Sequence, residues 1–270
     1  MLHNLAQLPR YRGLIQSLVA RELKARYRGS VLGFFWSFIN PLLLLLVYSF
    51  VFTYVMVGSQ DPRITPYPLF MFCGILPWTW FASSLNESAG VLISGGNLIK
   101  KVLFPAEVLP IVTVLSNMVH FLFGLVVLAG FLVYYRRPLY ASELVLFPVV
   151  VFVQLILTTG FALLLSALTV HFRDIRDILS NLLTFWFFAT PIIYPYFLFE
   201  DPLKPPMWQA KVLKLNPFTH LAITYQEILF FKGPVGHFKW LLLLGAISIV
   251  FFLFAYAVFD RLRDTFAEEV

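Results

Sequence analysis

The chain has 270 residues, of which 60% are hydrophobic, 18% aromatic and only 13% charged, and its mean hydropathy is +0.82. Because about a quarter of the residues in a soluble domain are charged, this composition excludes a soluble domain and indicates a polytopic membrane protein. The net charge of +6 does not indicate nucleic-acid binding, since the basic residues separate membrane-length apolar runs. The single cysteine, Cys73, excludes an intrachain disulfide and a cysteine-based metal site.

Residues 10–28 are predicted to form a basic amphipathic helix ahead of the first apolar run. At helical spacing its apolar and basic side chains fall on opposite sides, a pattern typical of a helix that lies along a membrane surface. The apolar stripe comprises Leu14, Ile15, Leu18, Val19, Leu23 and Tyr27, and the polar side includes Arg21, Lys24 and Arg28. Such a helix is either a simple basic anchor or a docking surface, and the sequence leaves both alternatives open.

Six apolar runs have the length of a membrane span, which needs about 20 helical residues at a rise of about 1.5 Å per residue. The predicted spans cover residues 31–57, 67–93, 106–135, 144–170, 178–199 and 238–259. Basic residues precede the first span and are in excess on the same side of the later spans, so we expect both termini in the cytoplasm. The expected fold is an all-α integral membrane protein with one transmembrane domain over residues 1–270.

Three segments between the spans are also predicted to be structured. Residues 94–105 favour a short cytoplasmic helix that begins near Asn97 and stops at a proline. The charge alternation of residues 171–177 fits pairing along a helical turn, contact with a partner protein or binding of a lipid headgroup. Between spans five and six, Asn216 and Pro217 predict a helix start, and we expect re-entrant helices there on the outer side of the membrane.

The sequence contains no recognisable motif for catalysis, nucleotide binding or metal binding. It has no G-x-x-x-x-G-K-[ST] phosphate loop, and its five histidines lack metal-ligand spacing. We therefore expect no catalytic residue, no metal site and no ATP hydrolysis by this chain. His120, one turn after Asn117 in the third span, is either an interhelical hydrogen-bond partner or a functional ionisable group. Only Glu87 and Glu107 bring carboxylates near the membrane, which disfavours a proton-coupled carrier.

Aromatic residues are more numerous in spans one and five than interfacial belts require. Phe facing lipid costs little, but the run of residues 34–38 covers several helix azimuths, so some rings must face protein or a lumen. Aromatic faces pack well against sugar C–H groups without demanding charge, so they suit a polymer that slides. The candidate channel-lining rings are Phe35, Trp36, Phe185, Trp186 and Tyr194.

Four sequence blocks follow one another along the chain. They are Arg26-Tyr-Arg-Gly-Ser-Val-Leu-Gly-Phe-Phe-Trp36, Phe104-Pro-Ala-Glu-Val-Leu-Pro110, Phe172-Arg-Asp-Ile175 followed by Thr190-Pro-Ile-Ile-Tyr194, and Asn216-Pro217. In this order they resemble the permease subunit of the polysaccharide and polyol-phosphate ABC exporters, of the O-antigen export type. The resemblance implies a homodimer of six-span permeases in the bacterial inner membrane, with two separate ATPase subunits that bind ATP and Mg²⁺. It also implies export of a lipid-linked glycan on a polyprenyl diphosphate carrier.

The resemblance further implies roles for individual segments. The interfacial helix and the loop between spans two and three would contact the ATPase, spans one and five would line the channel, and external helices at 200–232 would form an outer gate. Arg26 and Arg28 lie where they would capture an anionic headgroup at the inner leaflet. The implied ATPase-coupling residues are Arg21, Lys24, Asn97, Lys100, Lys101 and Phe104.

Two alternatives remain at this point. A capsule or teichoic acid exporter of the same family fits the same blocks. An intramembrane transferase acting on polyprenyl-linked sugars would need acidic or metal-binding residues in the external loops, where Glu200-Asp201 is the only acidic pair.

Overall fold

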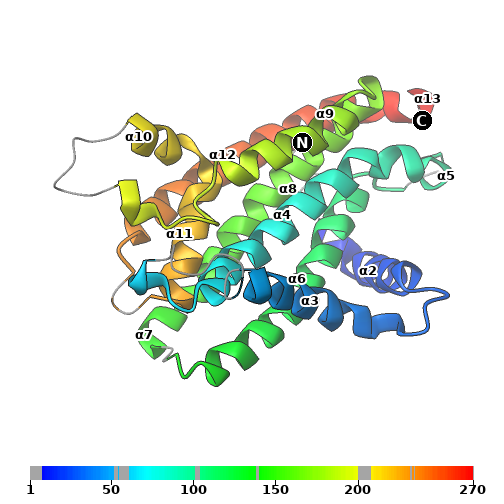
Figure 1. Ribbon diagram of the computed structural model, residues 1–270. Helices are drawn as coiled ribbons and strands as arrows, with labels where there is room; N and C mark the ends of the chain where they lie inside the picture. Colours follow the sequence, from blue (N-terminus) through cyan, green and yellow to red (C-terminus); the bar gives the residue numbers. More distant parts are fainter. Residues whose placement is uncertain are drawn as a thin grey trace.

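The computed structural model describes residues 8–51, 54, 61–100, 104–137, 140–199, 208–231, 233 and 235–269. In these ranges the regular secondary structure is helical throughout (Figure 1). Four of the described helices are long and apolar enough to cross a membrane. They are α4 (Tyr67–Ser94), α6 (Val108–Tyr134), α8 (Phe147–His171) and α12 (Phe238–Leu262), which continues into the 3₁₀ turn η6 (Arg263–Thr265).

The predicted fifth span contains a shorter helix than expected, whereas residues 52, 53 and 55–57 of the predicted first span lie outside the described residues. Within 31–57 the structure has the turn η2 (Gly33–Phe35) and helix α3 (Trp36–Phe50). Within 178–199 it has α9 (Ile175–Phe188), which ends well before residue 199. The cause lies in Pro191, because proline cannot donate a helical hydrogen bond and disfavours helical geometry in the residue before it. At about 1.5 Å per residue, α9 is about 21 Å long and α3 is about 22 Å long.

Helix α4 lies at the centre of the bundle and packs against α6, α8, α9, α3 and α11 (Pro217–Leu229). Of its most apolar 18-residue window, 83% is buried, the highest share among the four membrane-length helices. Aromatic rings fill the space around it: the Trp78 ring lies 4.9 Å from that of Phe218, and the Phe81 ring lies 5.2 Å from that of Trp186. Helix α4 therefore joins the N-terminal helices to the C-terminal ones.

The helices α2 (Arg12–Arg26), α5 (Gly96–Ile99) and α13 (Phe266–Glu269) gather at one end of the bundle, here termed the α5 end (Figure 1). The predicted amphipathic helix over 10–28 is present as α2, preceded by the turn η1 (Leu8–Tyr11). Its apolar stripe contacts protein, because Leu18 is buried in a cluster with Val108 and Val112 of α6. The contact with α6 gives this helix a fixed position in the bundle.

An ion pair with a buried carboxylate fastens the last turns of the chain to the same region. The Arg263 guanidinium lies 3.6 Å from the Glu107 carboxylate, whose side chain is only 3% exposed. Phe266 of α13 is fully buried and its ring lies 5.2 Å from that of Phe259. Since a buried carboxylate without a cation is costly, this pair holds the last turn against the start of α6.

The opposite end, here termed the α11 end, holds the helices between α9 and α12 (Figure 1). Helix α11 begins as predicted, because the Asn216 side chain accepts a hydrogen bond from the Phe218 backbone N–H at 3.0 Å and Pro217 occupies the first turn. Most of its side chains are buried. The remaining elements at this end are α7 (Ala141–Leu144), α10 (Trp208–Leu215), η4 (Pro62–Ile64) and η5 (Tyr196–Phe199).

Asn216 joins two elements through four hydrogen bonds. Its oxygen accepts from the Trp186 indole N–H at 2.7 Å and from the cap of α11, and its amide donates to Ala189 O at 3.0 Å and to Thr190 Oγ1 at 2.9 Å. The end of α9 and the start of α11 therefore share a single side chain.

We expect Asn216→Ala to lower the free energy of unfolding by about 2–4 kcal/mol, from the lost cap and the unsatisfied partners. Asn216→Asp keeps both accepted hydrogen bonds and removes the two donated ones, so it should lower the free energy of unfolding by less than Asn216→Ala does. Thermal unfolding in detergent measures the order. Asn181→Ala, at an exposed position of α9, is the control, and equal melting temperatures for all three variants would contradict the assignment.

Candidate functional site

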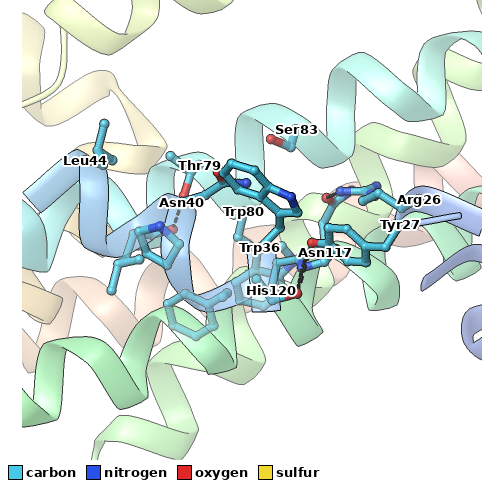
Figure 2. A pocket seen from close by; sticks show the side chains of 14 residues that line it. Arg26, Tyr27, Trp36, Asn40, Leu44, Thr79, Trp80, Ser83, Asn117 and His120 are labelled. Atoms are coloured by element: carbon cyan, nitrogen blue, oxygen red, sulfur yellow. Dashed lines mark hydrogen bonds between the residues drawn. The ribbon is translucent and has the colours of Figure 1, made fainter. Parts of the chain in front are cut away.

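A cavity of about 400 Å³ lies between the end of α2, the start of α3, α4 and α6 (Figure 2). Figure 2 shows Arg26 and Tyr27 at one end of it, Leu44 at the other, and Trp36 and Trp80 between them. Its volume is within the range of small-ligand pockets, about 300–1,000 Å³. The lining residues are Arg26, Tyr27, Trp36, Ser37, Asn40, Pro41, Leu44, Leu76, Thr79, Trp80, Ser83, Asn117, His120 and Phe121.

Three side chains from α2, α4 and α6 form a closed hydrogen-bonded triangle at the edge of this cavity. Arg26 donates from Nη2 to Glu87 Oε2 at 2.7 Å and from Nη1 to Asn117 Oδ1 at 3.2 Å. Asn117 donates from Nδ2 to the same Glu87 oxygen at 2.8 Å and to Thr113 O at 3.1 Å. Asn117 is buried, whereas the Arg26 and Glu87 side chains are 30% and 39% exposed. A ligand can therefore reach the two charged partners.

A second polar group connects α3 to the same place. Ser37 Oγ donates to the Tyr27 hydroxyl at 2.9 Å, and both hydroxyls lie 3.3 Å from Nδ1 of His120. The rings of Tyr27 and His120 meet edge to face, with centroids 5.8 Å apart. These contacts favour the structural alternative for His120, an interhelical hydrogen bond.

A polar furrow of about 820 Å³ lies on the other side of Arg26, between α2, α4 and α9. Burial raises the pKa of the Glu22 carboxyl in its wall, and the Glu87 carboxylate raises this pKa further against the opposing charge of Arg26. The Arg176 guanidinium crosses from α9 to lie over Gly90 of α4. The lining residues are Glu22, Asn86, Glu87, Gly90, Val91, Ser94, Thr113, Arg176, Asp177, Ser180 and Asn181.

The structure separates the five candidate channel rings into different surroundings. Phe35 and Phe185 are exposed, at 69% and 78%. Trp36 is half-buried and lines the cavity. Trp186 packs among core rings and donates to Asn216, and Tyr194 is half-buried and donates from its hydroxyl to Phe188 O at 3.0 Å. Their role in a channel stays a prediction, and the exposed Phe35 and Phe185 and the cavity-lining Trp36 are the rings that a ligand can reach.

The candidate coupling residues that the structure describes lie at the α5 end. Arg21, Lys24, Asn97 and Lys100 are exposed, and Phe104 is half-buried between the clusters that hold α2 and α13. Lys101 lies outside the described residues. The two candidate headgroup residues differ: Arg26 lines the cavity, whereas Arg28 is exposed and is absent from its lining.

A polar stripe on α4 was not predicted from the sequence. Thr79, Ser83, Asn86, Gly90 and Ser94 recur at steps of three or four residues and line the cavity or the furrow. Helical spacing could have revealed this stripe, because residues three or four apart lie on one side of a helix. That this side is left open to the cavity and the furrow could not be predicted, because it depends on the other helices burying the rest of α4. Among the described residues, no group of three or more His, Cys, Asp or Glu side chains could hold a metal ion.

Comparison with known proteins decides the family. Residues 13–230 match the family described as ABC-2 type transporter. The chain belongs to this family of transporter membrane subunits. It is 42% identical, over the full length of both chains, to the O-antigen export system permease protein RfbA of Myxococcus xanthus. It is 32% identical to a Klebsiella pneumoniae protein of the same description, over 94% of each chain.

A more distant relative has another described cargo. The Escherichia coli polysialic acid transport protein KpsM is 26% identical over 79% of this chain and 80% of its own length. The matches confirm the predicted family. With four membrane-length helices in the part of the chain that the structure describes, it is a multi-pass membrane permease of the ABC-2 type.

Proposed function

We propose that the chain is the membrane half of an ATP-driven exporter that moves a lipid-linked, O-antigen-like polysaccharide across the bacterial inner membrane on a polyprenyl diphosphate carrier. The main support is the 42% identity to an O-antigen export permease along the entire chain. The lower identity to the polysialic acid transporter makes a capsule polymer the second candidate. Because the sequence has no phosphate loop, ATP and Mg²⁺ belong to two separate ATPase subunits.

In this proposal two copies of the permease form the path together. Each has six membrane segments, with α3 and α9 as the first and fifth, and both termini in the cytoplasm. The support is that α3 and α9 leave apolar side chains uncovered, including Leu46, Val47, Leu182, Phe185 and Phe188. The α5 end then faces the ATPase, and the re-entrant α10 and α11 form the outer gate.

The polar furrow supports a polymer path along α4. Amide and hydroxyl groups such as those of Asn86, Ser180 and Asn181 pair with sugar hydroxyls, and they are unsuited to contact with lipid tails. An uncharged sugar chain needs such exchangeable hydrogen bonds if it is to move without being trapped. The transferase alternative gains no support, because its acidic pair Glu200-Asp201 lies outside the described residues.

The first test of the proposal concerns energy supply. The purified chain should hydrolyse no ATP, whereas co-purification with its cognate P-loop ATPase should give a complex that moves a fluorescent lipid-linked glycan across proteoliposomes only with ATP. Replacing the ATPase's Walker lysine is the matched control. ATP turnover by the isolated chain, or ATP-independent movement, would contradict the proposal.

A second prediction concerns the coupling surface. Lys100→Glu with Lys101→Glu should weaken ATPase binding at the α5 end about tenfold or more, because two attractive charges become repulsive. Membrane insertion should be unchanged, since Lys100 is exposed. Co-purification yield at matched expression measures the effect. Lys211→Glu, an exposed lysine at the α11 end, is the control, and normal ATPase binding by the double variant would place coupling elsewhere.

A third prediction separates two neighbouring rings. Phe185→Leu should slow export of long polymers more than short ones, since each passing sugar meets the exposed ring, and should leave stability unchanged. Trp186→Leu should instead lower the melting temperature, because it empties the aromatic cluster and removes the bond to Asn216. Chain-length profiles of exported glycan decide the matter. Phe152→Leu, at an exposed ring of α8, is the control. Matching chain-length profiles for Phe185→Leu and Phe152→Leu would contradict the prediction and indicate that Phe185 faces lipid.

A further inference from the structure

Arg26 stands in the wall between the cavity and the furrow. It lines the cavity, while the carboxylates that it approaches, Glu87 at 2.7 Å and Glu22 at 3.8 Å, line the furrow. This wall is an arginine–carboxylate contact, and a ligand in either the cavity or the furrow can reach it. A group arriving from the furrow meets Glu87 first and Arg26 directly behind it.

The contact has the geometry of an oxyanion site. Two N–H donors, Nη2 of Arg26 and Nδ2 of Asn117, converge on a single oxygen of Glu87 at 2.7 and 2.8 Å. Asn117 is fixed in place, because it is buried and also donates to Thr113 O. Guanidinium groups bind phosphate with the same geometry as carboxylate. Glu87 Oε2 therefore occupies the position that a phosphate oxygen would take.

The cavity behind Arg26 has the chemistry of a sugar pocket. Trp36 and Trp80 supply aromatic surface, and Asn40, Thr79 and Ser83 supply amide and hydroxyl groups, of which the Thr79 hydroxyl donates to Leu76 O at 2.8 Å. Few, placed polar groups on an aromatic lining are typical of small-molecule sites. Asn40 and Thr79 are exposed, so the pocket is open to its surroundings.

We propose that this place binds a glycosyl phosphate, with the phosphate held by Arg26 and Asn117 and the adjoining sugar placed against Trp36, and that Glu87 is an internal competitor for the phosphate. The inference rests on the proposed function and specifies where the carrier's headgroup binds. In the empty site Glu87 neutralises Arg26. When phosphate takes its place, Arg26 loses its contact with Glu87 of α4, so headgroup binding loosens the end of α2, the helix that carries the candidate coupling residues Arg21 and Lys24.

The test measures binding by calorimetry, using the full chain in lipid nanodiscs and farnesyl diphospho-N-acetylglucosamine as the probe. Arg26→Gln should weaken binding at least about tenfold, the usual effect of losing one charged hydrogen bond. Trp36→Leu should weaken it about threefold or more. Glu87→Gln, which keeps an acceptor for both donors but removes the competing charge, should tighten binding about threefold or more. Weaker binding by Glu87→Gln would overturn the proposal, because a purely structural Glu87 predicts that result.

Two further probes separate the parts of the ligand. Inorganic diphosphate should bind more weakly than the conjugate and lose affinity only with Arg26→Gln, whereas octyl glucoside should depend on Trp36 alone. Equal affinity for inorganic diphosphate and the conjugate would overturn the sugar assignment.

Arg12→Gln is the matched control and should bind like the original chain, since Arg12 is exposed at the opposite end of α2 and lies outside the cavity. If Arg26→Gln fails to fold, the Glu87→Gln and Trp36→Leu results still decide the matter. Because ATP-driven glycan movement is measured separately, unaltered binding in all these variants would remove this subsite and leave the proposed export function standing.

Discussion

The burial of α4 is the constraint on which the rest of the molecule depends. This helix is apolar enough to span a membrane and is covered by α6, α8 and α11, yet it carries polar side chains along one side. Polar groups at that depth need partners or water, so the side that bears them cannot face lipid. The cavity and the furrow both lie along it, flanked by α3 and α9. The position of the site thus follows from what the other helices leave uncovered.

The sequence predicted the membrane-length helices well and their neighbours less well. The runs that became α4, α6, α8 and α12 are long, apolar and bounded by charge or proline, so hydropathy located them within a few residues. The fifth run was too long because hydropathy continues through Pro191, where the helix cannot. Asn216 was recognisable in advance because capping depends on local residues.

Pairing between distant segments could not be predicted. Charge and an expected position near the inner leaflet point to Arg26 in the sequence, but its partners Glu87 and Asn117 come from helices far along the chain. The adjacent rings of Phe185 and Trp186 show the same limit. Helical spacing says that they point in different directions, and only the packing of α9 on α4 shows that Trp186 points inward.

The shared side chain of Asn216 gives α9 unequal support along its length. The last turn of α9 is fixed to α11 by the side-chain amide of Asn216 and by the Trp186 ring, whereas the first half of α9 buries only Leu179. A helix held in this way is fixed at one end and loosely packed at the other. Displacing it near Asp177 would disturb few buried side chains, whereas its last turn cannot shift without disturbing the hydrogen bonds to Asn216. A shift of the last turn of α9 therefore has to be shared by the first turn of α11.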